Sequence, residues 1–191
     1  MRALRYRGLR WRAMLDLVLG RRAAALALFE QMLREFPDDA YALASRVHLQ
    51  AQLGDRAAAL RGFEDLLARH GQVGAHWFNY GFLLEEGGDY DRAEAAFRRA
   101  TELSPQLDRA WYGLGLVLIR QRRLDEAVAA LKRNTQLQPM SPYGWYQLAR
   151  VHVDRQEPDE ARRIIRHLQG FEPKVAAQLV RETGLSVERA A

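Results

Sequence analysis

The chain of 191 residues contains no cysteine, so it has no disulfide, no thiolate nucleophile and no Cys-ligated zinc or iron–sulfur site. It also lacks a run of the roughly 20 apolar residues that cross a bilayer. The basic N-terminal segment is not typical of a signal peptide, because Asp16 interrupts its apolar stretch and Arg21 and Arg22 follow without a small-residue cleavage site. With 48% hydrophobic and 28% charged residues, the sequence predicts a soluble, cytoplasmic protein with one globular domain over 1–191.

Lysine is limited to Lys132 and Lys174, and the positive charge of the chain is concentrated at one end. The net charge is +5, yet residues 1–22 alone hold seven arginines against Asp16. The rest of the chain is therefore close to neutral, whereas nucleic-acid-binding proteins usually spread a basic stripe along the recognition surface. We expect no specific nucleic-acid partner. One alternative is an electrostatic adaptor that docks its arginine-rich N-terminus on anionic lipid or nucleic acid.

The residues that carry chemistry form no recognisable catalytic pattern. The five histidines include no HExxH pair, no GxxxxGK loop occurs, and no serine lies in a GxSxG motif. Glu85 and Glu86 are adjacent, and neighbours in sequence do not face one another on a helix. We interpret this acidic pair as a solvated helix end, with an acidic spot for a basic ligand group as the alternative. The sequence predicts no enzyme, no cofactor and no metal site.

A period of 34 residues runs through most of the chain. An alanine recurs at this spacing, a bulky apolar residue follows four positions later, and a proline or glycine follows eight positions after that. A glycine stands five residues before the first three alanines, and Arg122 and Gln156 replace it before the last two. These columns are Ala25, Ala59, Ala93, Ala127 and Ala161; Phe29, Phe63, Phe97, Leu131 and Ile165; Pro37, Gly71, Pro105, Pro139 and Pro173; and Gly20, Gly54 and Gly88. Four columns in phase over five units indicate a repeat protein.

Each column has a physical meaning that predicts a helix–turn–helix unit. Proline cannot continue a helix and glycine favours its left-handed end, so the breaker ends the second helix. The glycine near the middle permits a tight turn, and the alanine lets two helices cross closely. One hairpin cannot bury its own apolar face, so the units must stack. We expect repeats at 6–39, 40–73, 74–107, 108–141 and 142–175, followed by a capping helix at 176–191.

The units resemble the tetratricopeptide repeat (TPR) family. In residues 74–107 the family positions carry Trp77, Tyr80, Gly81, Leu84, Ala93, Phe97, Ala100 and Pro105. The next unit matches with Asn134 in place of a small alanine, and the first two units match mainly in their second helices. The resemblance implies an all-α, right-handed superhelical solenoid, with Trp77, Trp111 and Trp145 packed between the two helices of a unit.

The resemblance also places positions 2, 5, 9, 12 and 13 of each unit on the concave face. Aromatic residues occupy six of these 25 positions and 12 of the other 166. Aromatic side chains near arginine are typical of interface hot spots. We therefore expect a groove that binds a peptide or helix of a protein partner through Tyr41, His48, Phe78, Asn79, Phe82, Arg109, Tyr112, Tyr143, Tyr146 and Arg150. Self-association into a homo-oligomer, burial by neighbouring helices and a chaperone role for an extended client are the alternatives.

Some members of the family hold the C-terminal carboxylate of a partner with a clamp of lysine, asparagine and arginine side chains. The matching positions of this chain carry Ala44, His48, Asn79, Arg109 and Gly113. Two of the five agree in kind, and neither belongs to the leading Lys–Asn pair. The sequence therefore disfavours that clamp.

Overall fold

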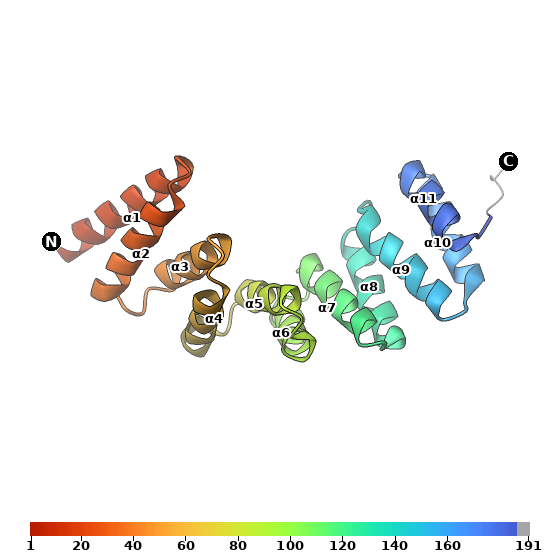
Figure 1. The fold of residues 1–191 in the computed structure, drawn as a ribbon, viewed down its shortest axis with the longest axis horizontal. Coiled ribbons are helices and arrows are strands. Elements are labelled where there is room, and N and C mark those ends of the chain that lie inside the picture. The colour runs from red at the N-terminus through yellow and green to blue at the C-terminus, as the bar shows by residue number, and fades with distance from the viewer. Residues whose placement is uncertain (187–191) are drawn as a thin grey trace.

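The computed structural model describes residues 1–186, which form helices and no strands. The helices are α1 (Arg2–Val18), α2 (Arg22–Glu35), α3 (Ala40–Gln52), α4 (Arg56–His70), α5 (Gly74–Glu86), α6 (Tyr90–Leu103), α7 (Asp108–Arg120), α8 (Leu124–Leu137), α9 (Pro142–Asp154), α10 (Pro158–Gln169) and α11 (Pro173–Thr183). They form a curved stack that runs in one direction, with α1 at one end and α11 at the other (Figure 1). The expected all-α superhelical solenoid is confirmed.

Successive helices pair as antiparallel hairpins that fall within the expected repeat ranges, except that α1 begins ahead of residue 6. Each hairpin contacts the next through its second helix and the following first helix, as α6 does with α7 and α8 with α9. The first helices α5, α7 and α9 also contact one another in turn. Neighbouring units therefore pack mainly second helix against first helix, and contacts between successive first helices are added from α5 to α9.

Local sequence signals set the helix boundaries. Three aspartates precede first or second helices and accept hydrogen bonds from backbone N–H groups of the first turn: Asp39 Oδ1 from Ala42 N at 2.8 Å, Asp55 Oδ1 from Ala58 N at 3.0 Å and Asp89 Oδ1 from Arg92 N at 3.4 Å. Such N-caps satisfy donors that the helix itself leaves unpaired. At the other end, α2, α6 and α8 each stop two residues before a proline of the breaker column.

The turn inside every hairpin uses one backbone conformation. The residue five positions before each column alanine has a positive φ, at 72° for Gly20, 86° for Gly54, 79° for Gly88 and 62° for both Arg122 and Gln156. Glycine adopts this left-handed region freely, whereas a residue with a Cβ is strained there by roughly 1–2 kcal/mol. The last two turns therefore keep the geometry of the first three at an energetic cost.

We expect Arg122→Gly and Gln156→Gly each to raise the free energy of unfolding by about 0.5–1 kcal/mol, because relief of strain exceeds the extra entropy of glycine in the unfolded chain. Both side chains are exposed, so the substitutions remove little packing. Denaturant unfolding measures the change, with Gly88→Ala as the matched reverse variant that should lose stability. Destabilisation by both glycine substitutions would show that Arg122 and Gln156 stabilise their turns through their side chains.

The core lies in the seams between helices. All five alanines of the repeat column are fully buried, as the close crossing of two helices requires. Within the third unit, a Cβ placed on Gly81 would lie 3.3 Å from the carbonyl oxygen of Ala93, and the ring of Phe97 fills the space beside both. In the fourth unit Asn134 is buried in place of the usual alanine, and its Nδ2 donates to the carbonyl of Asp108 at 2.9 Å.

The three tryptophans of the repeat join one unit to the turn before it. The indole N–H of Trp77 donates to the carbonyl of Gly71 at 2.8 Å, that of Trp111 to Pro105 at 3.0 Å and that of Trp145 to Pro139 at 2.8 Å. All three side chains are half-buried. Each indole therefore packs in its unit and also ties that unit to the breaker residue of the preceding one.

The C-terminal cap is α11, which begins at Pro173 and ends at Thr183 before a left-handed Gly184. Ala176 and Leu179 are buried against α9 and α10, and the residues on the opposite side are polar. The capping helix expected over 176–191 corresponds to this shorter helix. The last five residues of the expected range, 187–191, lie outside the described residues.

Candidate functional site

Half of the residues expected to bind a peptide lie together in one hollow. A hollow of about 450 Å³ between α3, α5 and α7 contains His48, Phe78, Asn79, Phe82 and Arg109. Its remaining lining residues are Ala51, Gln52, Phe63, Leu83 and Glu86. The residues come from three consecutive first helices, together with one core phenylalanine of α4. Five of the ten expected residues thus line a single depression in the surface.

The two phenylalanines that α5 contributes to this hollow differ in how they are held. The ring of Phe78 lies 6.0 Å from the buried ring of Phe97, and the guanidinium of Arg109 covers it at 5.0 Å. Phe82 is one turn further along α5 and remains 49% exposed. Phe78 is therefore held in place by its neighbours, while the half-exposed ring of Phe82 offers an apolar surface to a ligand.

His48 and Arg109 supply the polar part of the hollow. The side-chain amide of Gln52 donates to Nε2 of His48 at 2.9 Å, which orients the imidazole on α3. Arg109 is exposed, and within residues 1–186 it forms no ion pair with a carboxylate. The hollow therefore combines an exposed aromatic ring with a cation that has no acidic partner in the described chain.

A second, smaller hollow adjoins the first around the C-terminal end of α5. It has a volume of about 230 Å³ and contains Arg150, the sixth of the expected residues. Its other lining residues are Glu85, Leu116, Ile119, Arg120, Gln147, Val151 and Asp154. Two arginines and two acids share this space, so their formal charges cancel. Glu85 and Glu86 lie at the boundary, one in each hollow.

Four expected residues lie outside both hollows. Tyr41 contacts the first repeat, where its hydroxyl donates to Sδ of Met14 at 2.8 Å and Arg10 lies 4.3 Å from its ring. Tyr112 is half-buried against the C-terminal part of the core. Tyr143 is 70% exposed at the start of α9.

Tyr146, the fourth, is engaged by the capping helix. Its hydroxyl donates to Oε2 of Glu182 at 2.6 Å, and the guanidinium of Arg150 lies 5.7 Å from its ring. This hydrogen bond raises the pKa of Tyr146 and partial burial adds to the shift, while the same bond lowers the pKa of Glu182. A ligand that used Tyr146 would have to displace the carboxylate of α11.

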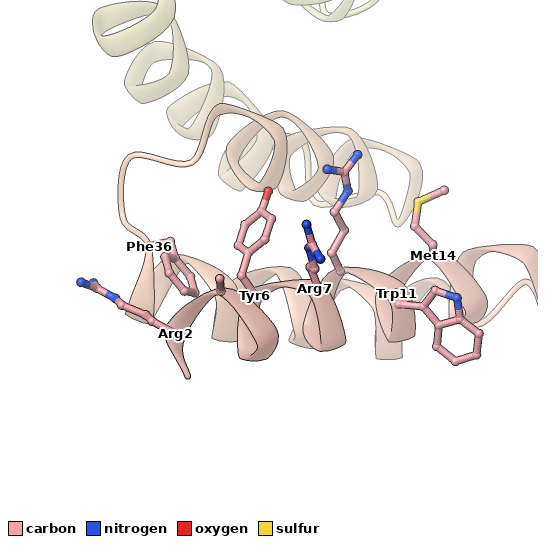
Figure 2. A pocket seen from close by; sticks show the side chains of 8 residues that line it. Arg2, Tyr6, Arg7, Trp11, Met14 and Phe36 are labelled. Carbon is pink, nitrogen blue, oxygen red and sulfur yellow. The ribbon is translucent and has the colours of Figure 1, made fainter.

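Sequence reasoning missed a third hollow, at the free end of the stack. It measures about 870 Å³ and lies along α1, lined by Arg2, Ala3, Tyr6, Arg7, Arg10, Trp11, Met14 and Phe36. Figure 2 shows Tyr6, Arg7, Trp11 and Met14 following one another along α1, with Arg2 and Phe36 at its N-terminal end. Tyr6, Trp11 and Phe36 fall outside the concave positions of a repeat. Tyr6 and Trp11 lie among the arginines of residues 1–22, which was the signal in the sequence, whereas Phe36 had none.

Two further observations concern the part of the chain that the structure describes. No helix in residues 1–186 is long and apolar enough to cross a membrane. No three histidine or acidic side chains among those residues are grouped as metal ligands would be.

The family is established by comparison of the sequence with family models. A tetratricopeptide repeat model matches residues 44–108, 83–142 and 112–176, which together span more than half of the chain. The protein therefore belongs to the tetratricopeptide repeat family. Members of this family are generally non-catalytic scaffolds, and the fold supports a protein–protein interaction scaffold here. No curated protein sequence matches the chain.

Solved structures of tetratricopeptide repeat proteins share the fold at low sequence identity. Residues 41 to the end of MamA from Desulfovibrio magneticus RS-1 align with a TM-score of 0.79 and 21% identity, over 93% of this chain and 96% of that one. PilF from Pseudomonas aeruginosa aligns with a TM-score of 0.73 and 21% identity, over 97% and 95% of the two chains. YrrB, described as a TPR protein with an unusual peptide-binding site, aligns with a TM-score of 0.77 and 19% identity, over 88% of each chain.

Proposed function

We propose that this protein binds an extended or helical peptide segment of a protein partner in the hollow between α3, α5 and α7. The observation that carries the proposal is the half-exposed ring of Phe82, which stands beside Phe78 and Arg109 in a depression of about 450 Å³. An aromatic ring at the centre of a concave surface is the usual anchor of a binding hot spot. The peptide-binding description of YrrB, a protein with the same fold, is consistent with this use.

The lining predicts the chemistry of the ligand. Phe82, Phe78 and Leu83 favour an apolar or aromatic anchor on the peptide. Arg109 has no carboxylate partner in residues 1–186, so an acidic group beside that anchor would complete the charge pairing. The second hollow, which holds Arg120 and Arg150 with Glu85 and Asp154, adds further contact area.

Peptides selected from a displayed random library against the purified protein provide the probe. Calorimetric titration of a selected peptide should show that Phe82→Ala weakens binding at least tenfold, because loss of a hot-spot aromatic costs about 2 kcal/mol or more. Arg109→Glu should slow association and reduce the preference for acidic peptides. Tyr143→Ala is the matched control, since Tyr143 is exposed but lies outside both hollows.

Full affinity of Phe82→Ala, with helicity retained at the temperature of the titration, would move the binding site away from the α3–α5–α7 hollow. Loss of affinity in Tyr143→Ala as large as in Phe82→Ala would also contradict the assignment.

A further inference from the structure

The outer face of α1, which is the side turned away from buried Leu9 and Ala13, carries an apolar stripe that no other helix covers in residues 1–186. Leu4, Trp11, Leu15 and Val18 follow at spacings of seven, four and three, so they share one face of the helix. Their exposed fractions are 73%, 68%, 42% and 81%. The opposite face, with Leu9 and Ala13, is buried against α2. Large apolar side chains are thus exposed together on one side of the terminal helix.

Arginines flank this stripe on both sides. Helical spacing places Arg5 and Arg12 along one edge, and Arg7 and Arg10 along the other. Arg5 pairs with Glu35 at 2.8 Å, whereas Arg7 and Arg12 form no ion pair within residues 1–186. The acidic residue of this segment, Asp16, lies 3.8 Å from Arg21. A partner surface that covers the stripe and pairs with these arginines would therefore carry negative charge along both edges.

Charge and shape disfavour a second copy of the chain as this surface. A symmetric contact between two α1 helices would bring the flanking arginines together. The outward residues of α11 include Lys174, Gln178 and Arg181, which do not match an apolar stripe, so end-to-end stacking is also disfavoured. Nucleic acid would pair with the arginines but would leave Leu4, Leu15 and Val18 without an apolar contact.

We propose that the outer face of α1 binds anionic membrane surfaces. An amphipathic helix with tryptophan and leucine on one face and arginines on its borders lies in the plane of a lipid interface, where basic side chains reach the headgroups. A single helix at the end of a stack is a convex ridge, which a deformable lipid surface fits without a complementary groove. Figure 1 shows α1 at one end of the stack, and the exposed fractions of Leu4, Trp11 and Val18 show that no described helix packs on this side of α1.

The arginine hollow on the adjacent side of α1 supports the same orientation. Arg2, Arg7 and Arg10 line it together with Trp11, and Figure 2 shows Arg7 and Trp11 within two turns of one another on α1. Arg2 is held in place, since its guanidinium donates to the carbonyl of Glu35 at 2.9 Å. Lipid phosphates at this edge of the stripe would meet Arg7 and Arg10.

The test is co-sedimentation of the full chain with vesicles of phosphatidylcholine alone and with about 30% phosphatidylglycerol added. We expect at least tenfold stronger binding to the anionic vesicles, falling as salt is raised. Trp11→Glu should abolish most of this binding. The control is Met140→Glu, which makes the same charge change at an exposed apolar residue between α8 and α9, and it should alter binding less than twofold. Arg7→Gln with Arg12→Gln should weaken it about tenfold or more.

Circular dichroism checks that each variant keeps its helices, as expected for exposed positions. Equal binding to both vesicle types, or equal effects of Trp11→Glu and Met140→Glu, would overturn the proposal. Absence of binding to anionic vesicles would also overturn it and would favour an acidic protein as the partner of this face. None of these outcomes bears on the α3–α5–α7 hollow, which the variants leave unchanged.

Discussion

Replacement of Phe97 by alanine should lower the free energy of unfolding by about 3–5 kcal/mol, the range typical of a buried phenylalanine. The ring is 1% exposed and joins two units. It contacts Gly81 of its own unit so closely that a Cβ there would lie 3.0 Å away, and a Cβ on Gly113 of the next unit would lie 2.6 Å from Cζ. Both glycines leave room for this ring, so its removal leaves a cavity between α5, α6 and α7.

Phe82→Ala is the matched control, with the same substitution on the adjacent helix at a half-exposed site. It should cost about 1 kcal/mol, because roughly half of its apolar surface is already in water. Denaturant unfolding of the two variants measures the difference. Equal losses at the two positions would show that Phe97 does not join the units as described.

Ala93→Leu should destabilise the protein by about 1–3 kcal/mol, because the larger side chain would force apart the crossing of α5 and α6. Ala93 is fully buried, and its backbone already approaches Gly81. In a solenoid each unit is stabilised by its neighbours, so the disturbance should extend to the flanking units. Amide hydrogen exchange should therefore speed up in α4 and α7 as well as in α6.

Ala95→Leu, on the exposed side of α6, is the control for this prediction and should change stability by less than about 0.5 kcal/mol. If Ala93→Leu had the melting temperature of the unmodified protein, the assignment of the alanine column to helix crossings would be wrong.

Features that repeat with a period of 34 were predictable from the sequence. The left-handed turns at Arg122 and Gln156 follow from their phase with three glycines, although neither residue favours that conformation. Burial of the alanine column and the positions of the helix ends follow in the same way. Each of these features depends on contacts inside one unit or between equivalent positions of adjacent units, so the repeat itself encodes them.

Contacts that occur in only one of the five units could not be predicted from the repeat. Asn134 replaces a small alanine, and Gly144 in the next unit makes room for it, since a Cβ on Gly144 would overlap Oδ1 of Asn134. The engagement of Tyr146 by Glu182 depends on where the capping helix packs, which no repeat position specifies. The hollow along α1 is formed largely by residues outside the concave positions, such as Tyr6, Trp11 and Phe36.

The same distinction applies to the candidate site. Concave positions taken from the repeat located His48, Phe78, Phe82 and Arg109, which lie in one hollow together with Asn79, a position matched to the carboxylate clamp. Tyr41 and Tyr146 occupy equally concave positions but contact Met14 and Glu182. Position within a repeat predicts the face of a side chain, whereas its availability to a ligand depends on the ends of the stack.

The central claim, that ligand binds on the inner side of α3, α5 and α7, is tested most directly by NMR chemical-shift mapping of the isotope-labelled protein with a selected peptide. The account predicts that the largest shifts fall on residues 48–52 of α3, 78–86 of α5 and around Arg109 of α7, and that they disappear in Phe82→Ala. Shifts confined to the second helices α4, α6 and α8, or to α1, would contradict it.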